Sequence, residues 1–237
     1  MENMNKNEWI EEIKKLNINL TEEQIDKLDE YANFLLEYNQ YTNLTAIKTK
    51  EEVYLKHFYD SLTLIKIANL TEGKLLDVGT GAGFPGLVLA IAFPKLEVTL
   101  LDSNNKKIAF LDECIQKLKI SNATTVYDRA ENYTRTHREQ FDFVTSRAVA
   151  ELRILLELNI PALKINGEFL VMKANVEEEL NQALKTIEIL DCKIISQEIF
   201  ELPKNGGKRT LLKIKKEKQT LLKYPRTYDK IKKKAIG

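Results

Sequence analysis

A glycine-rich turn between two strand-like runs is the feature that most constrains this chain. Residues 77–86 read DVGTGAGFPG and follow the apolar end of the run at residues 75–78. Glycines let the backbone turn sharply after a strand and let a ligand approach the main chain closely. Pro85 suits the first position of a helix, and we expect the amides of that helix to point toward the ligand. The turn therefore predicts a ligand cleft at one edge of a sheet.

The residues around the turn distinguish between two cofactors. Residues 81–86 match the dinucleotide pattern G-x-G-x-x-G, but Gly79 and a carboxylate, Asp77, precede the match. That carboxylate would repel a pyrophosphate, whereas it would attract the sulfonium and ammonium groups of S-adenosylmethionine, directly or through water. Asp102 lies 23 positions after Gly79, where it suits the ribose hydroxyls of either cofactor. We predict S-adenosylmethionine, with Asp77, Gly79, Gly81 and Asp102 at its site; capping of local amides is an equal alternative role for Asp77.

Strand-like runs and helical segments alternate from the turn onward. The runs are residues 75–78, 98–101, 124–127, 141–144 and 169–172, and the helical segments include 105–118 and 176–190. Such alternation indicates right-handed crossovers and a mostly parallel sheet covered on both faces. Two last runs, 193–200 and 209–215, flank a Pro-Lys-Asn-Gly-Gly loop that predicts a hairpin. We predict an α/β class I S-adenosylmethionine-dependent methyltransferase fold: Rossmann-like, seven-stranded, mostly parallel, with an antiparallel C-terminal hairpin.

Helices are expected before this core. Residues 21–24 read TEEQ, a capping-box pattern, and apolar residues then recur at helical spacing to Leu36. A second helix is expected over about residues 51–68. We therefore divide the chain into an N-terminal helical extension packed on the core (1–70), a methyltransferase core (71–216) and a basic C-terminal tail (217–237), within one structural domain.

Composition excludes several classes of protein. No apolar run approaches the roughly 18–20 residues that span a bilayer, and the polar N-terminus lacks the apolar stretch of a signal peptide. The two cysteines, Cys114 and Cys192, have no thiol nearby at metal or redox spacing. We expect a cytoplasmic protein without a membrane partner and without a metal site.

The net charge of +1 hides an asymmetry along the chain. From residue 204 onward there are thirteen Lys or Arg against Glu217 and Asp229, which gives 13 − 2 = +11 and leaves −10 for the first 203 residues. A basic end on an acidic body suggests a polyanionic partner. We expect Lys204, Lys208, Arg209 and Arg226 to contact the phosphates of such a partner, which the resemblance described next implies to be RNA.

Several segments together resemble the ribosomal small-subunit methyltransferase G family, also called glucose-inhibited division protein B. The matching segments, in chain order, are residues 43–45 (NLT), 57–62 (HFYDSL), 77–86, 100–103 (LLDS), 129–131 (RAE), 146–150 (SRAVA) and 224–226 (YPR). The resemblance implies a 16S rRNA guanine-N7 methyltransferase acting on bacterial ribosomal RNA, with Gly79, Phe84, Ala130, Glu131 and Arg147 at the cofactor. It further implies 16S ribosomal RNA, the small ribosomal subunit or an assembly intermediate as partner, and we expect a monomer.

The chemistry that the resemblance implies needs no general base. Guanine N7 already presents a lone pair, so alignment can supply much of the rate. Arg147 follows the fourth strand, where it could position the substrate or the cofactor. Three alternatives remain open: a methyltransferase for a small molecule or a protein, a non-catalytic cofactor-dependent RNA-binding module, and, ranked last, a nicotinamide enzyme.

Overall fold

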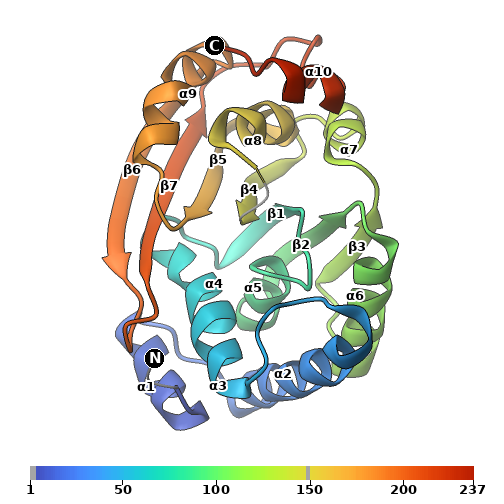
Figure 1. The fold of residues 1–237 in the computed structure, drawn as a ribbon, viewed down its shortest axis with the longest axis vertical. Coiled ribbons are helices and arrows are strands. Elements are labelled where there is room, and N and C mark those ends of the chain that lie inside the picture. Colours follow the sequence, from blue (N-terminus) through green and yellow to red (C-terminus); the bar gives the residue numbers. More distant parts are fainter. Residues whose placement is uncertain (1–3, 148–149) are drawn as a thin grey trace.

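Seven strands form one sheet in the order β3-β2-β1-β4-β5-β7-β6 (Figure 1). The computed structural model describes residues 4–147 and 150–237, so two residues of the family-like segment 146–150 lie outside the described part. The strands are β1 (Glu72–Val78), β2 (Lys95–Asp102), β3 (Ala123–Tyr127), β4 (Phe141–Arg147), β5 (Leu163–Lys173), β6 (Cys192–Glu201) and β7 (Lys208–Lys216).

Strands β3, β2, β1, β4 and β5 are parallel, and β7 runs antiparallel to both β5 and β6. The predicted fold class is therefore confirmed, including the C-terminal hairpin around residues 203–207. Because the carboxyl ends of the parallel strands meet at one edge, side chains that follow β1 to β5 gather there.

Helices cover both faces of the sheet (Figure 1). Side chains alternate along each strand, so Leu100 joins the apolar cluster under α5 (Gly86–Ala92) and α6 (Asn105–Leu118), whereas Leu101 joins the opposite cluster. That second cluster is covered by α7 (Ala130–Thr136), α8 (Leu152–Asn159) with the 3₁₀ turn η3 (Ile160–Ala162), and α9 (Glu177–Ile189). The sheet thus separates two hydrophobic cores.

The N-terminal helices α1 (Lys6–Lys15) and α2 (Glu22–Thr42) share the first of these cores. The predicted capping box at Thr21 and Gln24 is present, and the Gln24 side chain also donates hydrogen bonds to the carbonyls of Ile91 and Ala92 at the end of α5. Tyr31, fully buried, donates its hydroxyl hydrogen to the carbonyl of Ala82 in the glycine turn. Helix α2 therefore contacts and supports the glycine turn through Tyr31.

The single helix expected at residues 51–68 is wrong in detail. The segment contains α3 (Lys50–Val53), the π-helix η1 (Tyr54–Tyr59), α4 (Asp60–Leu62) and the 3₁₀ turn η2 (Thr63–Lys66). Two of its carbonyls accept side-chain hydrogen bonds: that of Lys56 from Arg147, at 3.1 Å, and that of His57 from Ser61, at 2.6 Å. Such bonds compete with the regular ladder and accompany π-turns, which are frequent at functional sites.

After β7 the chain crosses the α8 side of the molecule and ends with the short helix α10 (Tyr228–Lys233), next to α7 and α8 in Figure 1. None of the described helices combines the length and the apolar character needed to cross a membrane.

Candidate functional site

One pocket of about 550 Å³ lies at the carboxyl ends of β1, β2 and β3. All the sequence candidates for the cofactor except Asp77 line it, namely Gly79, Gly81, Phe84, Asp102, Ala130, Glu131 and Arg147. The structure therefore brings together residues that are up to 68 positions apart in the chain, as expected for a cleft at the carboxyl edge of a parallel sheet.

The glycine turn forms the floor of this pocket because its backbone has positive φ at three positions. Gly79, Gly81 and Gly83 have φ of 71°, 63° and 98°. The amides of Gly79 and Thr80 donate to the carbonyl of Leu101, at 2.8 and 3.0 Å, which ties the turn to the end of β2. A Cβ added at Gly81 would meet no atom within 4 Å, so this glycine borders open space. The turn leaves room for a ligand that approaches its main chain.

Asp77 lies beneath the turn and caps it. Its side chain is fully buried, and Oδ2 accepts hydrogen bonds from the Thr80 hydroxyl at 2.7 Å and from the Gly86 amide at 2.8 Å. Of the two roles considered for Asp77, the structure shows the capping one. Burial raises the pKa of Asp77 to about 6, although the bonds from Thr80 and Gly86 oppose the shift.

This arrangement corrects the expectation that the first amides of α5 point toward the ligand. Pro85 immediately precedes the first helical residue, and the free amide of Gly86 is taken by Asp77. A pyrophosphate needs such helix N-terminal donors, so the site does not suit a dinucleotide.

Asp102 stands at the middle of the pocket wall. Its Oδ2 accepts from the amide of Gly81 and its Oδ1 from the amide of Asn104, each at 2.9 Å, and Lys107 Nζ lies 3.6 Å away. Each carboxylate oxygen has a second lone pair, so the group can accept further hydrogen bonds from a pair of hydroxyls. Its geometry links the glycine turn to the end of β2.

The outer end of the pocket follows β3. Asp128, Ala130 and Glu131 line it, together with Arg129, whose Nε donates to Glu131 at 2.7 Å. The Arg129 guanidinium also lies over the ring of Tyr228, with 5.1 Å between its central carbon and the ring centroid. Tyr228, from α10, lines the same pocket. Nothing in the sequence pattern indicated this residue, because it lies about one hundred positions away in the basic tail.

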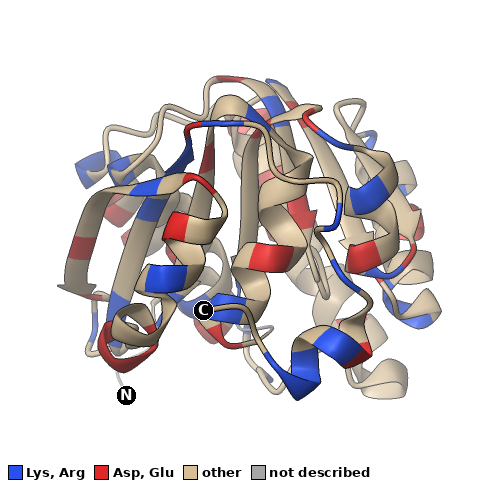
Figure 2. Ribbon diagram, turned by 90° about the horizontal axis from the view of Figure 1, so that it is seen from above, with Lys and Arg blue, Asp and Glu red and all other residues tan. Residues whose placement is uncertain are grey.

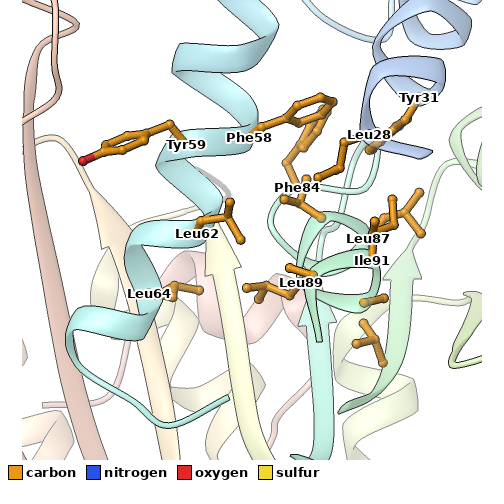
Figure 3. Close-up of a cluster of buried hydrophobic side chains, with 14 of the residues drawn as sticks. Leu28, Tyr31, Phe58, Tyr59, Leu62, Leu64, Phe84, Leu87, Leu89 and Ile91 are labelled. Carbon is orange, nitrogen blue, oxygen red and sulfur yellow. The ribbon is translucent and has the colours of Figure 1, made fainter. Parts of the chain in front are cut away.

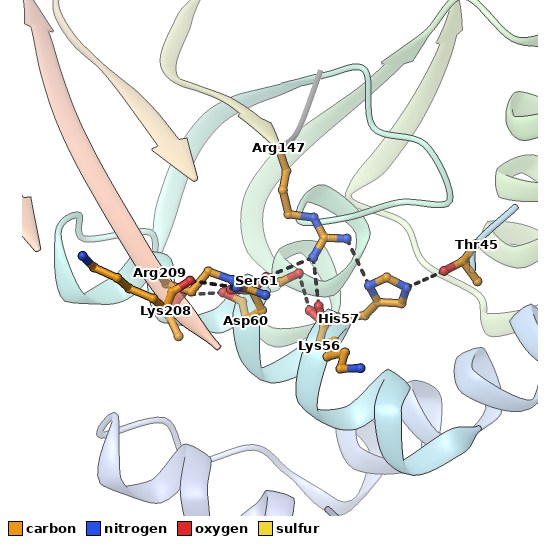
Figure 4. Close-up of polar contacts among 9 residues, drawn as sticks. Thr45, Lys56, His57, Asp60, Ser61, Arg147, Lys208 and Arg209 are labelled. Carbon is orange, nitrogen blue, oxygen red and sulfur yellow. Dashed lines mark hydrogen bonds and ion pairs between the residues drawn. The ribbon is translucent and has the colours of Figure 1, made fainter. Parts of the chain in front are cut away.

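A cluster of polar side chains closes the inner end of the pocket (Figure 4). Arg147 Nη1 donates to the Lys56 carbonyl at 3.1 Å and to Asp60 Oδ2 at 3.3 Å, while Nη2 lies 3.1 Å from His57 Nδ1. His57 Nε2 lies 3.0 Å from the hydroxyl of Thr45. Since Arg147 can only donate, His57 Nδ1 accepts, and the ring proton resides on Nε2 and is donated to Thr45.

The imidazole of His57 is also held by packing. It lies against Phe84, which belongs to an aromatic cluster with Tyr31 and Phe58 (Figure 3), and the Arg147 guanidinium lies 5.2 Å from the centroid of the Phe84 ring. Burial, and then the charge of Arg147, lower the pKa of His57 well below its usual value. His57 is therefore neutral, as its role as acceptor requires. The sequence did not predict the position of His57 at the pocket wall.

A second cavity, of about 500 Å³, begins on the other side of Arg147. It lies at the carboxyl ends of β4 and β5, and it shares His57 and Arg147 with the first pocket. Its other lining residues are mostly polar: Lys56, Asp60, Met172, Lys173, Ala174, Asn175, Glu179 and Arg209. The sequence did not predict this cavity.

Lys173 and Glu179 form an ion pair in the second cavity. Lys173 Nζ lies 2.8 Å from Glu179 Oε2 and donates to the carbonyl of Ala150, also at 2.8 Å. The Lys173 side chain is only 11% exposed. Three oxygens lie within 2.9 Å of Nζ, namely the Ala150 carbonyl and both carboxylate oxygens of Glu179, so a ligand acceptor would take the place of one Glu179 oxygen.

The four RNA candidates do not form one patch. Lys204, Lys208 and Arg209 lie in or beside the β6–β7 hairpin, near α1, whereas Arg226 lies beside α10 at the opposite end of the molecule (Figure 1). Three have carboxylate partners: Lys204 with Glu8 at 2.8 Å, Arg209 with Asp60 at 2.9 Å and Arg226 with the buried Glu157 at 2.7 Å. Lys208 is exposed, and none of the described carboxylates pairs with it.

Neither cavity contains the ligands of a metal site. Among the described residues no group of three or more His, Cys, Asp or Glu side chains is arranged to hold an ion.

Comparison with known proteins identifies the family. The model of the family described as rRNA small subunit methyltransferase G matches residues 24–212. The chain is 46% identical over 228 residues to "Ribosomal RNA small subunit methyltransferase G" of Lactococcus lactis subsp. cremoris (strain MG1363), with 94% of this chain and 95% of that protein covered. It is 47% identical over 216 residues to the protein of the same name from Ligilactobacillus salivarius (strain UCC118), with 88% and 90% covered.

Solved structures agree on the fold. The M. jannaschii TYW2 structure in complex with AdoMet superposes with a TM-score of 0.55 at 18% identity, covering 68% of this chain and 75% of that chain. The 16S rRNA (adenine(1408)-N(1))-methyltransferase of Catenulisporales acidiphilia gives 0.53 at 15% identity, covering 63% and 87%. The family model covers residues 24–212, and these two relatives cover 94% and 88% of the chain at 46% and 47% identity. The chain therefore belongs to the rRNA small subunit methyltransferase G family.

Proposed function

We propose that this protein transfers the methyl group of S-adenosylmethionine to N7 of one guanine in bacterial 16S ribosomal RNA, with S-adenosylhomocysteine as the second product. Family membership supports the methyltransferase activity and a ribosomal RNA substrate. The single structural observation that carries the proposal is the pair of cavities on one sheet edge that meet at Arg147 and His57. The reaction is proposed for a monomer in the cytoplasm, on naked 16S RNA, on the small subunit or on an assembly intermediate.

The order of the strands supports a direction for the cofactor. The ends of β3, β2, β1, β4 and β5 follow one another along the edge. Main-chain groups at residues 128–131 would hold adenine, Asp102 the ribose hydroxyls, and Gly79 and Gly81 the amino-acid end of the cofactor. Open space at Gly81 and spare lone pairs at Asp102 fit this ligand. Asp77 would act through the turn that it caps.

When bound, the cofactor supplies a methyl carbon attached to a positively charged sulfur. This carbon would pass to the N7 lone pair of guanine, and the electron pair of the carbon–sulfur bond would stay on sulfur. No proton would need to move before the bond forms, which agrees with the neutral state of His57, whose two ring nitrogens are both engaged. Catalysis then depends on alignment, which contributes up to about 7–11 kcal/mol when the reacting atoms are well oriented.

The second cavity is the proposed position of the target base. Guanine presents O6 beside N7 as acceptors, and its N1–H and N2 amino group as donors. Lys173 would donate to O6 in place of one of its bonds to Glu179, and Arg147 would lie between the base and the cofactor. The carboxylate of Glu179 can accept from N1–H or N2. Adenine carries an amino group in place of O6, so the same cations would disfavour it.

A transfer assay tests the proposal. Cofactor with a labelled methyl group is incubated with this protein and, separately, naked 16S RNA, small subunits from a strain that lacks the protein, and a pool of small metabolites. We expect label in RNA, and mass spectrometry of the digested RNA should identify 7-methylguanosine at one position. Label only in small molecules or protein, or RNA binding without any methylated base, would overturn the proposal.

A further inference from the structure

We propose that the C-terminal segment, residues 217–237, forms the outer wall of the cofactor pocket as well as a docking surface for RNA phosphates. Tyr228 connects the two, so that cofactor and RNA strengthen each other's binding. The inference deepens the proposed function and rests on it for the identity of the RNA. Its structural basis is the reach of this segment into the pocket.

Tyr228 contributes to the outer end of the pocket from a helix of the C-terminal segment. Its ring lies against the guanidinium of Arg129, which is in turn held by Glu131 through a hydrogen bond of 2.7 Å. An aromatic ring and a planar guanidinium are both suitable surfaces for stacking on a purine. We infer that Tyr228 and Arg129 together cover the adenine ring, and that the Tyr228 hydroxyl is dispensable because no described residue pairs with it.

Three arginines anchor the segment to the core beside the pocket. Arg135 Nη2 donates to the carbonyl of Pro225 at 2.6 Å, and Arg138 donates to the carbonyls of Tyr224, at 2.7 Å, and Thr220. Arg226 pairs with Glu157 of α8 through two hydrogen bonds, of 2.7 and 2.8 Å. Arg135 and Arg138 flank the end of α7, whose start lines the pocket, so the position of the segment is linked to that of the pocket wall.

The outer side of the segment is positively charged. Six of its lysines are exposed; Lys218 pairs with Asp191 at 3.1 Å, whereas none of the described carboxylates pairs with the other five, which are Lys223, Lys230, Lys232, Lys233 and Lys234. Figure 2 looks down on this side and shows Lys and Arg along the ribbon next to the C-terminus. This distinguishes these five lysines from Lys204 and Arg209, which form ion pairs with Glu8 and Asp60. Unpaired lysines attract phosphates, and binding releases counterions.

Helix α10, which connects the cofactor pocket to the lysine surface, has little stability of its own. Helix α10 has six residues and no side-chain cap at its N-terminus, and several like charges repel one another along it. Isolated helices of this length are unstable in water, so its order depends on the packing of Ile231, which is fully buried, and on its surroundings. Phosphates that neutralise the lysines stabilise α10 and hold Tyr228 over the adenine. Linkage then requires that bound cofactor increase RNA affinity by the same factor.

Calorimetry with S-adenosylhomocysteine, on the protein without RNA, tests whether Tyr228 contributes to cofactor binding. We expect Tyr228→Ala to weaken binding about tenfold, as loss of one stacking contact does, and Tyr228→Phe to bind as the wild type. Wild-type affinity in Tyr228→Ala would remove Tyr228 from the pocket. Because no RNA is present, this result is independent of whether the protein methylates ribosomal RNA.

The coupling is tested with small subunits from a strain that lacks the protein. We expect saturating S-adenosylhomocysteine to tighten wild-type binding to subunits several-fold, and Tyr228→Ala to lose this effect while it binds them normally without the cofactor. Replacing Lys230, Lys232 and Lys233 by Gln should weaken subunit binding, whereas the exposed Lys193→Gln on β6 serves as the matched control. Equal subunit affinity with and without the cofactor in the wild type would overturn the coupling, even if methyl transfer to a guanine proceeds.

Discussion

The imidazole of His57 lies parallel to the ring of Phe84, with 4.0 Å between the ring centroids and 16° between the planes. The contact joins the π-helix of the N-terminal region to the glycine turn of the core. Because His57 Nδ1 also accepts a hydrogen bond from Arg147, one neutral side chain positions both the turn and the cation that separates the two cavities.

Replacement of His57 should therefore lower the rate of methyl transfer in protein that still folds. We expect His57→Ala to lower kcat/KM for RNA about a hundredfold, because misplacement of a group by 1 Å costs roughly that much. His57→Gln keeps an acceptor for Arg147 but not the ring, and should recover part of the loss. Single-turnover transfer measured beside unfolding curves separates the effects. Equal activity of the two variants would show that the hydrogen bond to Arg147 is unimportant.

The same histidine predicts a pH dependence of stability. Burial, and secondarily Arg147, lower the pKa of His57, so the native side chain stays neutral while the unfolded one gains a proton below about pH 6.5. The unfolded state then binds more protons, and stability falls as the pH falls. The free-energy advantage of the wild type over His57→Gln should therefore shrink between pH 7.5 and 5. Urea unfolding at both pH values measures it; a constant difference would contradict the assignment.

A methyl group added at Gly83 should mainly lower stability, whereas one added at Gly81 should mainly weaken cofactor binding. A Cβ at Gly83 would lie 2.5 Å from the Tyr31 hydroxyl oxygen and 2.9 Å from Leu111 Cδ2, so Gly83→Ala should lower the free energy of unfolding by about 3 kcal/mol. A Cβ at Gly81 enters open space, so Gly81→Ala should lose only about 1 kcal/mol for its positive φ. Its methyl group should instead weaken the binding of S-adenosylhomocysteine. Calorimetry and thermal unfolding of both variants test the pair, and the reverse pattern would refute it.

The sequence predicted the elements whose signals are local. Helix α6 begins and ends at Asn105 and Leu118 as expected, and the seven strands lie where the apolar runs stand, because periodicity and turn residues act over a few positions. The cofactor pocket was predicted for a related reason: in a parallel sheet, residues that follow successive strands must meet at one edge.

The parts that were missed depend on tertiary contacts. The carbonyls of the π-helix accept hydrogen bonds from the side chains of Arg147 and Ser61, and apolar spacing cannot reveal such contacts. Tyr228 reaches the pocket from the C-terminal segment, which Arg135 and Arg138 hold through hydrogen bonds to its carbonyls. The pairing of Arg209 with Asp60 likewise joins residues 149 positions apart, so charge counting alone described it as free for RNA.

The free energy of unfolding of Asp77→Asn, relative to that of the wild type, should increase with pH. Burial raises the pKa of Asp77 to about 6, so between about pH 4 and 6 the native carboxyl holds a proton that the unfolded one has lost. Stability from this group therefore falls as the pH rises toward 6, by an amount on the order of 2–3 kcal/mol. Asp77→Asn does not titrate and keeps an acceptor for Gly86, so its stability relative to the wild type should increase from pH 4 to 8. Urea unfolding across this range measures it; a pH-independent difference would show that Asp77 is ionised throughout.

Replacement of Lys173 should impair methyl transfer to RNA and leave cofactor binding unchanged. We expect Lys173→Met to lower kcat/KM for RNA at least about tenfold, since a buried donor to the base is lost, with S-adenosylhomocysteine affinity unchanged. Lys164→Met is the matched control, because Lys164 lies at the other end of β5 and is also paired, with Asp142 at 2.6 Å. An RNA with inosine at the mapped position lacks the N2 amino group, so Glu179→Gln should reduce the preference for guanosine over inosine. Unchanged kinetics in Lys173→Met would remove the second cavity as the base site, even if the wild type methylates a guanine.

Replacement of Arg226 tests whether this residue forms a structural ion pair or contacts an RNA phosphate. Glu157 is fully buried and accepts from the backbone and side chain of Arg226, so Arg226→Met leaves a buried charge without its partner and should cost about 3–5 kcal/mol. Adding Glu157→Gln removes that charge and should restore part of the stability. If Arg226 instead contacts a phosphate, Arg226→Met should leave unfolding unchanged and reduce the salt slope of RNA binding by about 0.7. Urea unfolding of the single and double variants, beside RNA titrations at several salt concentrations, decides between these results, and we expect the loss of stability.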